Sequence, residues 1–136
     1  RPGVHGLEPW LQAAPKANCI GHAPPFWSSI SAGLAPADLR GYPKTPVKHG
    51  GALDRLMDKY PNLYGDLSAG SGLNALRRDP DFGRAFVERR ADRLLFGTDY
   101  LAEGQQVDQF AFLDQLDLPA DVQKKVFRDN LQKLLR

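Results

Sequence analysis

The sequence lacks the features that identify several large classes of protein, namely paired cysteines, long apolar runs and a signal-peptide pattern. Its 136 residues contain a single cysteine, Cys19, which excludes an internal disulfide framework and favours a reducing compartment. No apolar run approaches the length of a membrane span, and the N-terminus has no signal-peptide pattern. We therefore expect no membrane partner and favour a cytoplasmic location, which an upstream targeting segment would change. Because the first residue is Arg1 instead of methionine, we expect a processed or truncated chain.

Strong charge of either sign is also missing. The formal net charge is +2, and the short basic pairs Arg77-Arg78 and Arg89-Arg90 are expected on solvated helix faces. A nucleic-acid site would need a basic stripe with interleaved aromatic residues, which the sequence lacks. With 42% hydrophobic and 25% charged residues, the composition is that of an ordinary globular protein, and the length suits one domain with a core.

Strand-like and helix-like segments alternate along the chain, without an internal repeat. Short apolar runs predict strands at residues 19–22, 63–67 and 94–98. Helical spacing of apolar residues predicts helices near 6–12, 51–60, 73–78, 79–86, 107–116 and 118–135. Residues 23–51 are rich in Pro and Gly and are expected to form a long irregular loop, ordered by its aromatic residues. This order predicts an α/β fold with a parallel sheet.

Two of the predicted strands end in side chains that can do chemistry. Asp99 follows the strand Leu94–Thr98, and His22 ends the strand that begins at Cys19. In barrels of alternating strands and helices, active sites lie at these carboxyl ends of the strands. Residues two apart share a face of a strand, so Gly97 is expected to leave space around Asp99.

The same alternation separates Cys19 from His22. The two side chains would lie on opposite faces of a regular strand, so a nucleophilic or metal-binding pair is not expected. Free cysteine is commonly a small buried apolar residue, and we expect that role for Cys19.

Three motifs, with their order and spacing, carry a resemblance to a known family. They are Gly21-His22-Ala23-Pro24-Pro25-Phe26-Trp27, then Pro61-Asn62-Leu63-Tyr64-Gly65-Asp66-Leu67-Ser68-Ala69, then Leu95-Phe96-Gly97-Thr98-Asp99-Tyr100. The chain resembles the amidohydrolase superfamily, and more narrowly the amidohydrolase-related (amidohydrolase 2) family of metal-dependent hydrolases and decarboxylases. The closing segment Asn130–Leu135 is also similar to the ends of those chains. The resemblance covers nearly the whole chain, but only the last three strand-helix units of an eight-unit barrel.

The resemblance implies roles for two residues. Asp99 matches the aspartate at the end of the eighth strand, which is a metal ligand and a proton-transfer group. His22 matches the histidine at the end of the sixth strand, which lies beside the metal, or ligates a second metal in some relatives, and polarises the substrate. The implied cofactor is a divalent metal ion, with zinc expected first. The family's His-x-His pair is missing here, and His5 is too close to the sixth strand to be the fifth-strand ligand.

Further candidates lie near these two residues. Asp66 is either a site residue at a strand end or a carboxylate that caps the loop 68–72. Phe26 and Trp27 are candidates for substrate contacts, although aromatic residues more often serve packing. Ser68 is expected to be a hydrogen-bonding loop residue, because no second histidine is placed to activate it as a nucleophile.

These observations predict that residues 1–136 are the C-terminal portion of a single (β/α)₈ barrel domain, with strands six to eight and without the N-terminal half. The predicted function is that of a metal-dependent hydrolase, in which a metal-activated water attacks a carbonyl-type small-molecule substrate. The alternatives are a non-oxidative decarboxylase of the same family and a non-catalytic α/β binding module. A homo-oligomer also remains open. We expect the isolated segment to be inactive, to bind metal poorly and to aggregate.

Overall fold

A three-stranded parallel sheet lies at the centre of the fold. The computed structural model describes residues 3–136. The strands are β1 (Cys19–Gly21), β2 (Leu63–Asp66) and β3 (Leu94–Leu95), in the order β1-β2-β3. Gly21 pairs with Gly65, and Asp66 pairs with Leu95. The predicted α/β class with a parallel sheet is confirmed.

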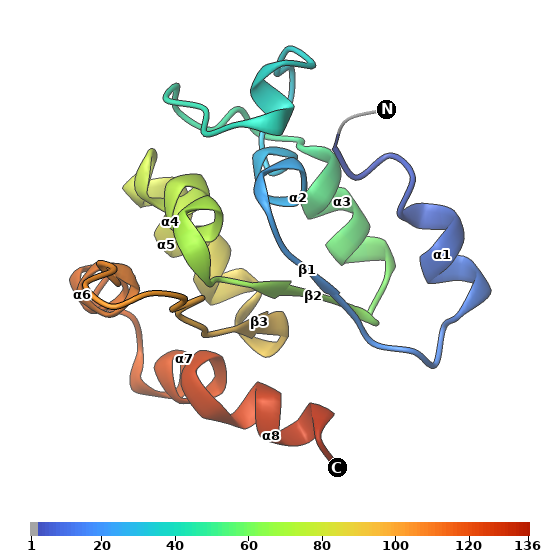
Figure 1. Cartoon of the computed structure of the whole chain (residues 1–136). Helices are drawn as coiled ribbons and strands as arrows, with labels where there is room; N and C mark the ends of the chain where they lie inside the picture. The colour runs from blue at the N-terminus through green and yellow to red at the C-terminus, as the bar shows by residue number, and fades with distance from the viewer. Residues whose placement is uncertain (1–2) are drawn as a thin grey trace.

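Helices surround this sheet (Figure 1). The longer ones are α1 (Glu8–Ala13), α3 (Ala52–Lys59), α4 (Ala69–Arg77), α5 (Pro80–Arg89) and α6 (Gln109–Gln115). The shorter ones are α2 (Pro24–Ser28), η1 (Asp38–Arg40), η2 (Ala91–Arg93), α7 (Ala120–Lys124), η3 (Lys125–Asp129) and α8 (Asn130–Leu134). In the view of Figure 1, α1 and α3 lie to the right of the strands, α4 lies to their left, and α7 and α8 lie along the bottom. Helix α5 contacts α3 through Arg89 and Asp54. None of the helices within residues 3–136 combines the length and apolar character that a membrane crossing requires.

Local signals in the sequence explain several helix ends. Asp79 is the N-cap of α5, since its side chain accepts a hydrogen bond of 3.2 Å from the Phe82 amide, and Pro80 opens the first turn. Gly51 precedes α3 at a place where a β carbon would collide with the Ile30 carbonyl. The predicted cap and first-turn proline of α5 are therefore confirmed.

The core lies between the sheet and the helices that cover it. Its fully buried side chains come from elements far apart in the sequence: Trp27 of α2, Leu53 and Met57 of α3, Leu63 of β2 and Phe86 of α5. Trp27 meets Phe86 edge-on, with ring centroids 6.4 Å apart. Packing of this kind fixes α2 against the sheet, so the loop after β1 starts from a rigid position.

Several predicted boundaries were wrong. The segment 23–51 contains α2 and η1, and α4 begins at Ala69, inside the loop predicted at 68–72. The strand predicted at 94–98 ends at Leu95, because the Phe96 amide donates to the Val126 carbonyl at 3.0 Å and not to the sheet. The single helix predicted at 118–135 is divided into α7, the π-helical segment η3, and α8.

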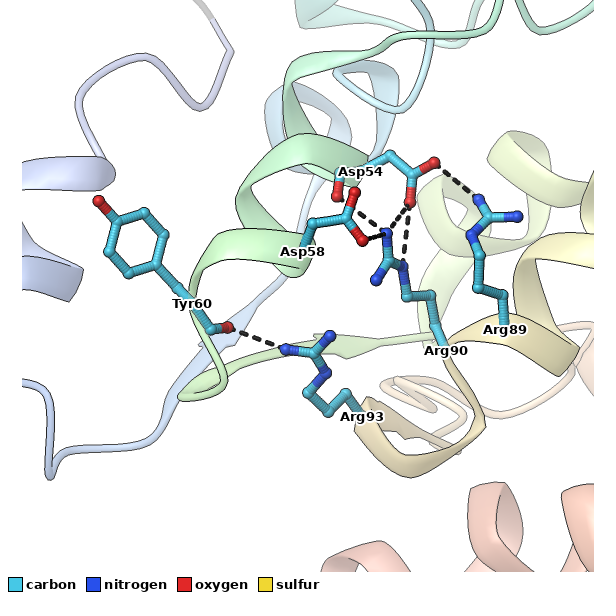
Figure 2. Close-up of polar contacts among 6 residues, drawn as sticks. All are labelled: Asp54, Asp58, Tyr60, Arg89, Arg90 and Arg93. Carbon is cyan, nitrogen blue, oxygen red and sulfur yellow. Dashed lines mark hydrogen bonds and ion pairs between the residues drawn. The ribbon is translucent and has the colours of Figure 1, made fainter.

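The pair Arg89-Arg90 does not form one solvated face, as Figure 2 shows. Arg90 is 5% exposed, and its guanidinium donates to Asp54 at 2.5 Å and to Asp58 at 2.6 Å. Arg89 is partly exposed and binds the other oxygen of Asp54 at 2.6 Å. The C-terminal end of α5 is thereby tied to α3. The prediction of a solvated face holds for Arg89 and was wrong for Arg90.

Candidate functional site

The carboxyl ends of β1 and β2 bring His22 and Asp66 together. Their parent strands are parallel and in register, with Gly21 opposite Gly65, so the next residue of each strand lies at the same edge. The Nδ1 atom of His22 is 3.0 Å from Oδ2 of Asp66. The side chains are 40% and 26% exposed, so the pair is open to solvent and to a ligand.

Ser68 completes this cluster. Its hydroxyl donates to Oδ2 of Asp66 at 2.6 Å and lies 3.3 Å from Nδ1 of His22. Its backbone amide donates to Oδ1 of Asp66 at 2.8 Å. The carboxylate of Asp66 therefore orders the turn into α4 and also contacts His22, while its role as a site residue stays a prediction.

The cluster differs from a nucleophilic triad. In a triad the carboxylate and the nucleophile bind opposite nitrogens of the imidazole ring. Here Asp66 and Ser68 both lie at Nδ1 of His22. A carboxylate only accepts hydrogen bonds, so Nδ1 carries the proton and Nε2 of neutral His22 presents a lone pair. Ser68 is thus a hydrogen-bonding residue, in agreement with the sequence-based expectation.

Neighbouring residues hold Asp66 in place. The indole Nε1 of fully buried Trp27 donates to the Asp66 carbonyl at 2.8 Å. A β carbon at Gly97 would lie 3.0 Å from Cβ of Ser68 and 3.1 Å from Oδ1 of Asp66. Gly97 therefore makes room for Asp66 and Ser68, whereas we had predicted that it leaves space around Asp99. A β carbon at position 97 would press on both side chains and displace them by a few tenths of an ångström.

Phe26 and Trp27 lie in the core. Phe26 is 6% exposed and its ring fills the space next to Gly21, where a β carbon would overlap it. The two rings pack edge to face, with centroids 5.3 Å apart and an interplanar angle of 87°. This placement supports packing over substrate contact for both residues, and it gives Trp27 the additional role of positioning Asp66.

Asp99 follows β3 after three irregular residues and is exposed. Its carbonyl accepts a hydrogen bond of 2.8 Å from the side chain of Gln105, whose oxygen in turn accepts from the Leu101 amide at 2.9 Å. Within residues 3–136, the carboxylate of Asp99 has no hydrogen bond or ion pair. The structure therefore joins His22 to Asp66, and it leaves Asp99 on the same edge without a side-chain partner.

Backbone strain is concentrated at the same edge. Among the described residues, four non-glycine residues have positive φ, and three of them follow the three strands: Ala23 (75°), Ala69 (59°) and Asp99 (52°). Such conformations cost about 1–3 kcal/mol each and persist where the surrounding structure enforces them. They cluster at active sites and ligand-binding loops, so the pattern supports this edge as the functional one.

The described residues contain no complete metal site. Within residues 3–136, no group of three His, Cys, Asp or Glu side chains is close enough to hold an ion. Cys19 is partly buried and packs against the core, and burial raises the pKa of its thiol. It forms no pair with His22, as the strand alternation predicted.

Ile20 lies beside this site, two residues before His22. It is 50% exposed, although it belongs to the strand β1. An aliphatic side chain on a strand normally faces a core, so the face that carries Ile20 and His22 lacks a cover within the described residues.

The sequence alone did not indicate how Ser68, Asp66 and His22 combine. Their alignment depends on the register of β1 with β2, which no local pattern shows. One local signal was available in the motif Asp66-Leu67-Ser68. An aspartate at the end of a strand commonly accepts a hydrogen bond from the backbone amide two residues later, here that of Ser68.

A three-stranded parallel sheet with helices between its strands defines an α/β protein. Comparison with family models is more specific, since the model described as Amidohydrolase matches residues 41–136. The chain belongs to this amidohydrolase-related family. No curated protein and no solved structure matches it. The matched range includes Asp66 and Asp99, whereas His22 precedes it.

Proposed function

We propose that this chain is part of a metal-dependent hydrolase of the amidohydrolase family, with its active site at the carboxyl edge of β1, β2 and β3. The single observation that carries the proposal is the contact of His22 Nδ1 with Asp66 at 3.0 Å, which leaves Nε2 available. We further propose that the sheet forms strands six to eight of an eight-stranded barrel. The exposed face with Ile20 and His22 supports this placement, because a barrel interior would cover it.

The donor types at this edge suit a divalent metal ion. An imidazole nitrogen from His22 and a carboxylate from Asp99 are the donor types that zinc takes in catalytic sites. A histidine ligand usually donates its other ring N–H to a carboxylate, which is the relation between His22 and Asp66. Within residues 3–136, however, no three such donor groups lie close enough together to hold an ion. A bound ion would polarise a carbonyl and lower the pKa of water at the site.

The proposed role of each side chain follows from whether it carries a proton or accepts one. Asp66 holds the Nδ1 proton of His22 and fixes the orientation of the ring, so it is a positioning residue. Neutral His22 in this tautomer acts through Nε2 as a ligand or a proton acceptor. It can donate to a substrate oxygen only after Nε2 has taken up a proton. Asp99 accepts a proton from the attacking water and passes it to the leaving group.

The test uses the protein expressed from its complete reading frame, with the variants Asp99→Asn and Asp117→Asn. Asp117 is a matched control, because it is also an exposed aspartate with positive φ, at 47°. Asparagine tolerates this backbone conformation, so neither change should disturb the fold. Metal content is measured by elemental analysis. Hydrolysis is assayed on amides, esters and lactones, and release of CO₂ from aromatic carboxylates is followed in parallel.

We expect Asp99→Asn to abolish turnover and reduce bound metal, and Asp117→Asn to keep both. Normal turnover in Asp99→Asn would reject the assignment of Asp99. Release of CO₂ without hydrolysis would replace the hydrolase with the decarboxylase of the same family. A purified protein with neither metal nor turnover would favour the non-catalytic binding module.

A further inference from the structure

A second feature is a pocket beside α4, which His22, Asp66 and Ser68 do not line. This open pocket of about 420 Å³ lies between the loop 42–47 and the helix α4 with its C-cap, Arg78. The loop is pinned to α4 and to the N-cap of α5, because the side chain of Asn74 donates to the Pro43 carbonyl at 3.2 Å and the Val47 amide donates to Asp79 at 3.0 Å. The pocket wall is therefore a fixed part of the fold.

Three cationic side chains line this pocket: Lys44, Arg77 and Arg78. Arg77 has a partner at the surface, Asp108, at 3.3 Å. Lys44 is exposed and forms no ion pair within the described part of the chain. Only one of the three cations thus forms an ion pair with a carboxylate within the described residues, and the pocket carries an excess of positive charge.

Arg78 differs from the other two cations because some of its N–H groups are buried without a hydrogen-bond partner. Its Nε and Nη2 atoms are buried and have no hydrogen-bond partner among residues 3–136. Its one hydrogen bond is a long one, from Nη1 to the Thr45 carbonyl at 3.4 Å. Native proteins rarely leave buried donors unpaired. An unpaired donor in the wall of a pocket therefore indicates that a ligand supplies the acceptor.

The neighbouring carboxylate, that of Asp79, does not supply that acceptor. Its two oxygens accept from backbone amides, Oδ2 from that of Val47 at 3.0 Å and Oδ1 from that of Phe82 at 3.2 Å. Burial lowers the pKa of Arg78, and the charge of Asp79 offsets this only in part. The guanidinium therefore carries a charge that its surroundings do not fully compensate.

The rest of the pocket is partly apolar. The ring of Tyr42 lies over Gly70, where a β carbon would be 3.3 Å from Cε1 of the ring, and Leu73 lines the same wall. A side chain at Gly70 would narrow the space beside the ring. A ligand with both an apolar body and an oxyanion would match these two kinds of surface.

We propose that this pocket binds the carboxylate or phosphate group of a small molecule, with Arg78 as the principal donor and Lys44 as a second cation. Turning the guanidinium of Arg78 toward the pocket gives its unpaired N–H groups an acceptor, and guanidinium binds such oxyanions in a bidentate manner. The apolar body of the ligand lies against Tyr42 and Leu73. This proposal is independent of the metal-dependent activity proposed above.

The test measures binding of inorganic phosphate and of benzoate to the wild-type protein by titration calorimetry, at constant ionic strength and with EDTA present. EDTA removes any bound metal, so binding of the anion to a metal ion at the His22 edge does not contribute. The variants are Arg78→Gln, Lys44→Ala and the control Arg84→Ala. Arg84 is an exposed residue of α5 that pairs with Glu88, so its loss changes the net charge equally without touching the pocket.

We expect one saturable site per chain, affinity about tenfold lower in Arg78→Gln and a few-fold lower in Lys44→Ala, and no change in Arg84→Ala. The bound anion should also raise the Tm of the wild type but not that of Arg78→Gln. Tighter binding of benzoate than of phosphate would identify a carboxylate ligand with an aromatic body, and the reverse order a phosphate. Absence of saturable binding, or equal losses in the Arg78 and Arg84 variants, would overturn the proposal. Because Lys44 is a surface residue, its variant remains folded and keeps the test decisive.

Discussion

Replacing Arg90 with methionine should destabilise the fold strongly, because it removes the buried link between α5 and α3. Methionine preserves most of the volume of the aliphatic stem and removes the charge and the donors. Four hydrogen bonds are lost, three to Asp54 at 2.5, 3.0 and 3.0 Å and one to Asp58 at 2.6 Å (Figure 2). Burial by itself lowers the pKa of Arg90, but its hydrogen bonds with Asp54 and Asp58 outweigh this effect and raise the pKa.

The magnitude follows from the exposure of the partners. Removing one member of a fully buried ion pair costs about 3–5 kcal/mol. The side chain of Asp54 is 20% exposed and keeps its contact with Arg89, while that of Asp58 is 68% exposed and can be hydrated. The expected loss is therefore lower, about 2–3 kcal/mol. For a domain of this length that corresponds to a fall in Tm of roughly 6–12 °C.

The matched control is Arg89→Met, one residue earlier on the same helix. Arg89 is 43% exposed and binds Asp54 through a single contact, so its loss should cost less than about 1 kcal/mol. Urea unfolding followed by circular dichroism measures both variants against the wild type. Equal destabilisation by the two changes would refute the reasoning, because burial of Arg90 would then contribute nothing.

Three further predictions concern other parts of the fold. Ala23→Gly should stabilise the protein by about 1 kcal/mol in thermal unfolding, because φ 75° and ψ 165° lie in a region that glycine alone adopts readily; a lower Tm would show that the strain is not present. Asn130→Ala should cost about 2–3 kcal/mol in urea unfolding, because the buried amide donates to the Ala91 and Leu94 carbonyls at 2.6 and 2.8 Å and both would lose their partner; a neutral effect would contradict this. Hydrogen bonds from Lys59 and Tyr60 lower the pKa of Glu8 below its ordinary value of 4.5, so its contribution is present above pH 4.5 and is lost as the pH falls through the lowered pKa. The stability difference between the wild type and Glu8→Gln should accordingly shrink on acidification, and a constant difference from pH 7 to pH 3 would disprove the linkage.

Features that depend on neighbouring residues in the chain were predictable from the sequence. Asp79 and Pro80 start α5 as expected, since a cap needs only its own helix. The apolar runs at β1 and β2 were placed within one residue of their ends. The parallel sheet followed from the alternation of strands with helices, and the family from the order and spacing of three motifs.

Features that depend on a single distant contact were not predictable. β3 ends at Leu95 because Phe96 finds its partner at Val126, thirty residues further along. Arg90 looks like any surface arginine until α3 brings Asp54 and Asp58 to it. The Nε and Nη2 atoms of Arg78, which have no partner within residues 3–136, likewise become buried only when the chain folds around them.

The candidate site also combines features that the local sequence predicts with features that distant contacts set. The sequence by itself determined that His22, Asp66 and Asp99 stand at or just beyond the ends of strands, because strand ends and the glycines near them are local signals. Only the tertiary structure decided which of them meet. The in-register pairing of β1 with β2 places Nδ1 of His22 against Asp66 and Ser68, and it thereby fixes which nitrogen remains available. The physical reason is that a hydrogen bond between side chains more than forty residues apart depends on the register of two strands, which the whole packed core sets.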